Sequence, residues 1–185
     1  MKSSAAKTRS TFVAVPKLAA FYGRPARRYV VHRSFAYWQA ERRVFGTMIW
    51  GRPDEADVAE MCAAHEVGAD PLFRGHTSLV DVRALESVDL LAFEKLLAYL
   101  QKRRDAWSPN VSKQVVLHRG GFAQATVAGM FQFLRPGHPV AFFDDPVAAY
   151  DAVGASDVRV ELEELHKMLL GIPEIVRRVQ TAFEV

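Results

Sequence analysis

The sequence has little cysteine and no long apolar run. Cys62 is the single cysteine among 185 residues, so a disulfide within the chain is excluded. A lone thiol suits a reducing compartment, and we therefore expect a cytoplasmic protein. No uncharged apolar stretch reaches the roughly 18 residues that a membrane-spanning helix needs, so we expect no membrane span.

The usual motifs of catalytic, metal and nucleotide sites are also missing. The six histidines form neither an H-x-H nor an H-E-x-x-H pattern. The chain has no G-x-G-x-x-G or G-x-x-x-x-G-K-S/T phosphate loop and no G-x-S-x-G nucleophile elbow. Cys62 and His65 have an allowed spacing for two zinc ligands, but no second Cys/His pair completes a tetrahedral site, and packing in a core explains both. We expect no metal, no cofactor and no enzyme activity.

Acidic residues are absent from the first 40 positions, which hold eight of the 24 lysines and arginines. The remaining 16 basic residues face 21 acidic ones, so the rest of the chain has a net charge of −5. We expect residues 1–28 to form a basic, flexible N-terminal arm. A transit peptide and a phosphate-binding arm are alternatives for this segment. The acidic body argues against nucleic-acid binding by the folded part.

Short apolar strands alternate with amphipathic helices over residues 29–154. Residues 29–38 and 41–50 are rich in β-branched and aromatic side chains and predict an antiparallel hairpin. Further strands are expected at 78–82, 113–118 and 138–145, with helices after Asp54, Asp89, Gly121 and Asp145. This order predicts an α/β domain with a mixed, mostly parallel sheet, the hairpin at one side and flanking helices.

Residues 155–185 keep helical spacing and predict a C-terminal helical extension. Apolar residues recur at Val158, Leu162, Leu165 and Leu169, and again beyond Pro173. Packing back on the sheet is the commonest arrangement for such helices, and pairing with a second copy in a homodimer is the next. A third alternative is that they lead to a further domain, which would make the chain the sensory part of a transcription regulator.

The stretch "LVDVRALESVD", residues 79–89, joins a strand end, a loop and a helix start, with Asp81 and Asp89 eight residues apart. Together with "VFGTMIWGRPDEADVAEM" and "VAFFDDPVAAYDAVG", it resembles the STAS domain of bacterial anti-sigma-factor antagonists, in its SpoIIAA-like subgroup. The resemblance runs from about Phe35 to Gly154. It implies a regulatory module that docks a protein partner. In topology this subgroup also resembles CRAL-TRIO lipid-binding proteins.

The helix start departs from the pattern of that family, in which a serine after the second aspartate is phosphorylated to switch partner binding. Leu90 and Leu91 occupy those positions, and residues 88–107 contain no serine or threonine. Ser87 precedes Asp89 and is better explained as a capping or loop residue. The resemblance therefore implies docking by surface complementarity around Ser87, Asp89, Leu90 and Leu91, without a phosphorylation switch. We expect Leu90 in the core and Leu91 exposed.

A second candidate site is "LHRGGFAQAT", residues 117–126. A strand end, two glycines and a helix start can leave backbone amides facing an anion, with His118 and Arg119 supplying positive charge. A tight turn is the simpler explanation of Gly120 and Gly121. With Arg83, these residues would contact a ligand at the carboxyl ends of the parallel strands, where α/β sheets usually bind.

These patterns together predict a non-catalytic, STAS-like regulatory module that binds a protein partner or an adjoining domain. The alternative is a small-molecule, lipid or anion-binding sensor.

Overall fold

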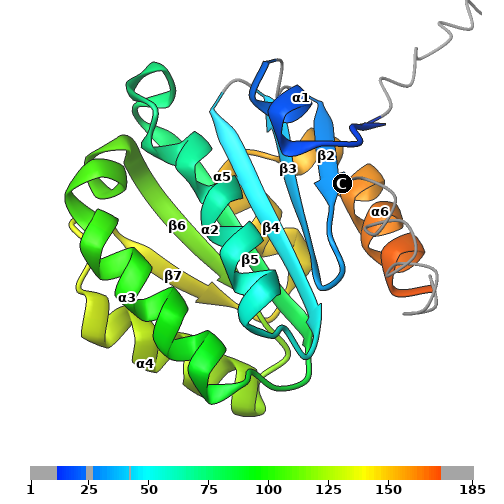
Figure 1. Ribbon diagram of the computed structural model, residues 1–185. Helices are drawn as coiled ribbons and strands as arrows, with labels where there is room; N and C mark the ends of the chain where they lie inside the picture. The colour runs from blue at the N-terminus through cyan, green and yellow to red at the C-terminus, as the bar shows by residue number, and fades with distance from the viewer. Residues whose placement is uncertain (1–11, 24–26, 42, 172–185) are drawn as a thin grey trace, which may run out of the picture.

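A sheet whose strands follow one another in chain order forms the centre of the protein (Figure 1). The computed structural model describes residues 12–23, 27–41 and 43–171. The neighbouring pairs β2–β3 and β3–β4 are antiparallel, whereas all other neighbours are parallel. The predicted α/β fold with a mostly parallel sheet is therefore confirmed. The strands within the described residues are β1 (Val13–Ala14), β2 (Arg28–Val31), β3 (Phe35–Glu41), β4 (Val44–Gly51), β5 (His76–Leu85), β6 (Val111–Leu117) and β7 (Val140–Phe143).

The predicted antiparallel hairpin is present as β3 and β4, but its first strand is divided by an additional turn. The sequence predicts one strand over residues 29–38, whereas β2 ends before His32 and β3 begins at Phe35. The backbone N–H of His32 donates to the carbonyl of Phe35 at 2.8 Å and closes a tight turn. Arg33 in this turn forms a salt bridge of 2.7 Å with Asp57, on the helix α2 (Glu55–Ala69). The turn is stabilised by a partner 24 residues away, which local strand propensity cannot reveal.

Aspartates begin three of the helices that flank the sheet. Asp54 caps α2, Asp89 caps α3 (Leu90–Trp107) and Asp145 caps α5 (Pro146–Val153). Each carboxylate accepts hydrogen bonds from two backbone N–H groups of the first turn, which have no partner within the helix. The predicted starts of these helices are confirmed. The other helices of the described chain are α1 (Leu18–Gly23), α4 (Gly121–Leu134) and α6 (Arg159–Gly171).

Helices cover both faces of the sheet (Figure 1). Because β4 to β7 are parallel and adjacent in chain order, right-handed crossovers place α2, α3 and α4 on the same face. On the opposite face, α5 and α6 pack over Trp38, Met48 and Leu79, which are fully buried. We call these the α2–α4 face and the α5–α6 face.

Segments at both ends of the described chain pack on this sheet. Leu162, Leu165 and Leu169 of α6 are buried on the α5–α6 face, so the described part of the C-terminal extension packs back as expected. Residues 12–23 differ from the expected flexible arm, because β1 pairs with β2 and Phe21 of α1 is fully buried. Residues 1–11 and 24–26 of the arm, and residues 172–185 of the extension, lie outside the described residues.

Gly46 gives Trp38 the space it occupies within the sheet. The two residues face each other across β3 and β4, and both are buried. A Cβ atom added to Gly46 would lie 2.1 Å from Cζ2 of Trp38, far inside van der Waals contact. The indole is fully buried and has no room to withdraw.

We predict that Gly46→Ala destabilises the protein by about 1–3 kcal/mol, the usual effect of overpacking a core. Urea denaturation followed by far-UV circular dichroism measures this loss. Gly129→Ala is the matched control, because Gly129 is exposed in α4 and an added Cβ would have no neighbour within 4 Å. It should stabilise the helix by about 0.5–1 kcal/mol. A Gly46→Ala protein as stable as the parent would contradict the role given to Trp38.

Candidate functional site

Asp81 lies inside the sheet and not at its edge. Its exposed fraction is 0%, and it pairs in register with Met48 on one side and Leu117 on the other. β5 continues four residues further, to Leu85. The strand expected over residues 78–82 is therefore longer than predicted at both ends, and Asp81 lies within it and not at a strand end. Asp89, by contrast, begins α3 as expected, accepting hydrogen bonds from the N–H groups of Leu91 at 3.0 Å and Ala92 at 3.1 Å.

Arg83 neutralises the buried carboxylate of Asp81 and ties β5 to α6. Its Nε lies 3.0 Å from Oδ1 of Asp81, and its Nη2 lies 2.6 Å from Oδ2. The other side of the guanidinium donates to Glu163, with Nη1–Oε2 at 3.1 Å and Nη2–Oε1 at 2.7 Å. Burial alone would lower the pKa of Arg83, but the hydrogen bonds to Asp81 and Glu163 outweigh it and raise that pKa. Arg83, which the sequence suggested as a ligand contact, is therefore already paired with two carboxylates.

The glycine pair of the second candidate site forms a turn. Gly120 has φ 80° and Gly121 has φ 68°, values that favour glycine over any other residue. The N–H of Gly120 donates to Nδ1 of His118 at 2.9 Å, so this ring nitrogen has a partner within the turn. His118 contacts Phe142 on the α2–α4 face, whereas Arg83 lies on the α5–α6 face. The structure therefore does not bring Arg83 and His118 together.

Apolar side chains are exposed where α3 and α4 begin. Leu90 has an exposed fraction of 67% and Leu91 of 59%, and Phe122 in the first turn of α4 has 58%. The expectation that Leu90 lies in the core is wrong, because the inward face of α3 starts only at Ala92, which is fully buried. Ser87 is half-buried in the preceding loop. We call Leu90, Leu91 and Phe122 the leucine edge.

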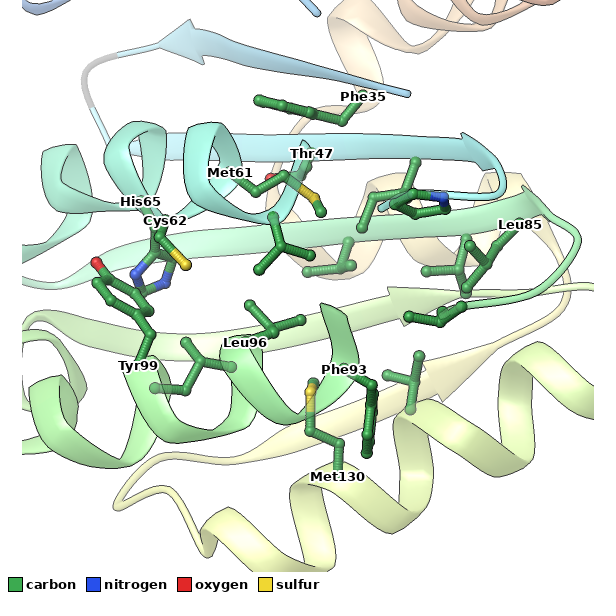
Figure 2. Close-up of a pocket in the computed structure, with 18 of the residues that line it drawn as sticks. Phe35, Thr47, Met61, Cys62, His65, Leu85, Phe93, Leu96, Tyr99 and Met130 are labelled. Atoms are coloured by element: carbon green, nitrogen blue, oxygen red, sulfur yellow. The ribbon is translucent and has the colours of Figure 1, made fainter. Parts of the chain in front are cut away.

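A cavity lies between the α2–α4 face of the sheet and the three helices above it. Its volume is about 130 Å³, and its walls come from β3, β4, β5, β6, α2, α3 and α4. Figure 2 shows Met61 and Cys62 of α2 and Phe93 and Leu96 of α3 facing this space. The lining is almost entirely aliphatic, aromatic or sulfur-containing. In the sequence, the helical residues of this lining are recognisable only as the buried faces of their helices. Helical spacing does not reveal how completely a helix face and the sheet fill the space between them.

A few polar groups interrupt the apolar lining at one end of the cavity. His65 of α2 and Tyr99 of α3 lie there beside Cys62 (Figure 2). The hydroxyl of Tyr99 donates to Oε1 of Glu66 at 2.6 Å, and Nη2 of Arg103 donates to Oε2 of the same carboxylate at 2.5 Å. Burial raises the pKa of the Cys62 thiol to about 11, so this cysteine is a thiol and not a thiolate at neutral pH.

Burial also keeps His65 uncharged. It lowers the pKa of the imidazole to about 4, and His76 and His138 add smaller contributions in the same direction. Nδ1 of His65 is buried and has no hydrogen-bond partner among the described residues. In the described part of the chain, no three His, Cys, Asp or Glu side chains converge as they would around a metal ion.

The comparisons with known proteins address the fold. No protein-family profile matches the sequence, and no curated protein matches it. A solved structure of an uncharacterised protein of the DUF3478 family from Shewanella loihica PV-4, described as having a SpoIIAA-like fold, superposes with a TM-score of 0.52. The match covers 65% of this chain and 94% of that one, at 15% sequence identity. This chain has a SpoIIAA-like fold. The predicted resemblance is confirmed at the level of the fold, which is all that this identity establishes.

Two features of this SpoIIAA-like chain bear on what it can contact: the exposed start of α3 and the apolarity of its helices. Its α3 begins with the exposed Leu90 and Leu91, so the first turn presents aliphatic side chains and no hydroxyl. Among the described residues, no helix combines the length and the apolarity required to cross a bilayer.

We predict that Arg83→Leu destabilises the SpoIIAA-like domain by about 3–5 kcal/mol, because it leaves the carboxylate of Asp81 buried without a partner. Arg52→Leu removes a matched cation whose salt bridge with Glu86 is largely exposed, at 76% and 63% for the two side chains. Its effect should stay below about 1 kcal/mol. Chemical denaturation of both variants measures the difference, and losses of similar size would show that the buried network stabilises no more than a surface pair.

Proposed function

We propose that this chain is a regulatory binding module whose cavity takes up a small, largely apolar molecule. The cavity of about 130 Å³ is the observation that carries the proposal. Protein interiors are normally close-packed, so a space of this size among apolar side chains is a candidate site for a ligand. A ligand that fills the space recovers the lost contacts and stabilises the folded state in proportion to its affinity.

The size and lining of the cavity favour a compact ligand. Apolar cavities of about 150 Å³ hold benzene, so this space suits a group of about one ring. Ligand sites in proteins typically combine an apolar lining with a few placed polar groups, as Thr47, His65 and Tyr99 provide here. A whole lipid is a poorer fit for this volume than a small molecule. Among the described residues, the side chains that line the cavity include no carboxylate.

The cavity and the leucine edge share one helix. Phe93 and Leu96 of α3 line the cavity, while Leu90 and Leu91 stand exposed at the start of the same helix. A ligand that shifts α3 relative to the sheet therefore also shifts the leucine edge. In this way occupancy of the cavity can change a docking surface, which is the step that makes a binding module regulatory.

A panel of toluene, phenol, benzoate and octanoate tests the cavity as a binding site. We predict that at least one of these compounds raises the melting temperature and slows modification of Cys62, which lines the cavity, by a small methanethiosulfonate reagent. Cys62 reports on the site directly, since it is the single cysteine of the chain. Absence of stabilisation and protection by every compound would refute the proposed function.

Ala64→Leu gives the structural control for this experiment. Ala64 lines the cavity, so the three heavy atoms that Ala64→Leu adds compete with a ligand for the same space and should abolish probe binding. Ala63→Leu adds the same atoms at the next position of α2, which is not part of the lining. Probe binding should persist in Ala63→Leu. If it persists in both variants, the probe binds outside the cavity.

A protein-docking role is the second candidate function, and the leucine edge favours it. Three large apolar side chains are exposed where α3 and α4 begin, an arrangement that often marks an interaction site. Asp89 and Glu94 are exposed beside the two leucines, whereas the nearby Glu86 is paired with Arg52. Charge complementarity therefore favours a partner with an apolar patch flanked by lysine or arginine.

We predict that Leu91→Glu weakens capture of this partner in a pulldown without lowering the melting temperature, because the side chain is exposed and a charge there meets other carboxylates. Leu72→Glu is the matched control, as Leu72 is 64% exposed in the short helix Pro71–Phe73, away from the leucine edge. A protein retained by the parent and by Leu72→Glu, but lost with Leu91→Glu, supports docking at this edge. Equal retention by all three contradicts it.

A further inference from the structure

The last strand of the sheet, β7, has an open outer side. The sheet begins with β1 and ends with β7, so within the described residues β6 is the one strand that pairs with β7 (Figure 1). On that inner side, the carbonyl of Phe143 accepts a hydrogen bond from the N–H of His118 at 2.9 Å. Because the backbone groups of successive residues point to opposite sides of a strand, Val140 and Phe142 direct their N–H and C=O groups outward.

This open side lacks the usual protection of a strand at the edge of a sheet. Such strands commonly carry a charged side chain, a proline or a bulge, which prevents pairing with another chain. Val140–Phe143 contains no charged residue and no proline, and its register with β6 is regular. The strand is short, however, so pairing through the backbone alone makes few hydrogen bonds. A partner needs side-chain contacts as well.

The helix next to β7 can supply these contacts, because it carries no charge. Phe131 of α4 contacts Phe142 of β7, with ring centroids 6.4 Å apart. The sequence of α4 contains no acidic or basic residue, whereas α2 and α3 on the same face of the sheet each contain several. An uncharged helix surface beside an open strand can pack against another apolar surface without burying a charge.

One flank of α4 is turned away from α3. Met130 and Leu134 belong to a cluster with residues of α3 and so mark the side of α4 that faces that helix. A rotation of 100° per residue places the opposite flank about half a turn away. The residues of this flank are small or polar, and exposed or half-buried: Ala125, Ala128 and Gln132. We call the open side of β7 together with this flank the β7 surface.

Opposite charges lie at the two ends of the β7 surface. Arg135 directly follows α4, shortly before β7 begins, and Asp144 directly follows β7. Both are exposed, and neither forms an ion pair with another described residue. If two β7 strands pair in antiparallel orientation, the start of one lies beside the end of the other. Arg135 of each copy then comes to the same end of the joint sheet as Asp144 of the other.

We propose that two copies of this chain associate through the β7 surface, with their β7 strands antiparallel around a two-fold axis at Ala141. Val140 of each copy then exchanges two hydrogen bonds with Phe142 of the other, and Ala141 lies opposite its own counterpart. The two α4 helices meet through their uncharged flanks. The two sheets become one continuous sheet. This inference concerns a different surface from the cavity and does not depend on a ligand.

Self-complementarity favours a second copy over an unrelated strand as the occupant. A two-fold interface uses the same surface on both subunits, so each of its features must match itself. The outward groups of Val140 and Phe142 are symmetric about Ala141, the flank of α4 has no charge to repel its own copy, and the two ends carry charges of opposite sign. All three features of the β7 surface meet this requirement.

Sedimentation equilibrium of the full chain tests the association. We expect a mass twice the 20.7 kDa of the chain at micromolar concentration. Ala125→Arg places a cation on each of the two facing flanks and should raise the dimer dissociation constant by at least about tenfold. Ala59→Arg makes the same change at an exposed alanine of α2 and should leave this constant unchanged. Both variants should keep the far-UV circular dichroism of the parent.

A charge swap tests the pairing at the two ends. Arg135→Asp should weaken the dimer, because it places like charges together, and aspartate tolerates the left-handed backbone at this position. Combining it with Asp144→Arg should restore the association. A residue that only stabilises its own turn would not be rescued by a change at the far end of β7.

Cross-linking tests the position of the two-fold axis. Residues that face each other without exchanging hydrogen bonds in an antiparallel pair have Cα atoms about 4.5 Å apart, within the range that a disulfide bridges. Ala141→Cys in a Cys62→Ala chain should therefore form a disulfide-linked dimer on mild oxidation. Ala59→Cys in the same background should not.

Two results would overturn the inference, and both leave the proposed function standing. The first is a parent chain that stays monomeric at every concentration tested, which leaves β7 open or available to an unrelated strand. The second is a dimer that persists in Ala125→Arg and does not cross-link through position 141, since its interface then lies on another surface.

Discussion

Parallel pairing of β4 to β7 in chain order is the constraint on which the rest of this structure depends. Each crossover is right-handed, so α2, α3 and α4 must lie side by side on one face. The chain after β7 is left to cover the other face, which α5 and α6 do. Two differently built layers follow from one topology. The layer of three long helices encloses the cavity, and the layer of two shorter helices closes over the aromatic residues of the hairpin.

The α5–α6 layer is anchored to the sheet by a buried charged network. On the α5–α6 face, the fully buried Asp81 is neutralised by Arg83, which also binds Glu163 and fixes α6 to the sheet. Every charge in that group has a partner, as burial requires. This arrangement is what a structural anchor between a strand and a helix needs. The α2–α4 face is built differently, with a cavity lined mostly by apolar side chains.

The sequence predicts well the features that depend on neighbours along the chain. The caps Asp54, Asp89 and Asp145 were predictable, since each carboxylate binds amides two or three residues away. The salt bridge between Arg83 and Glu163 joins residues 80 apart and has no local signal. The exposure of Leu90 escapes prediction as well, because helical periodicity continues past the point where the sheet ends. The cavity escapes prediction too, because the residues that line it have the same apolar spacing in the sequence as those of an ordinary close-packed core.

The start of α3 is poorly suited to accepting a phosphate, which is why the proposed regulation acts through occupancy of the cavity. A helix N-terminus attracts anions through its unpaired amides. Here the carboxylate of Asp89 already accepts from the amides of Leu91 and Ala92, so an anion would have to displace it and then meet Glu86 and Glu94 nearby. In the proposed function, the exposed leucines that follow respond to apolar contact and to movement of α3. Phe93 and Leu96 of the same helix line the cavity, so their packing against a ligand would supply a physical route for that movement.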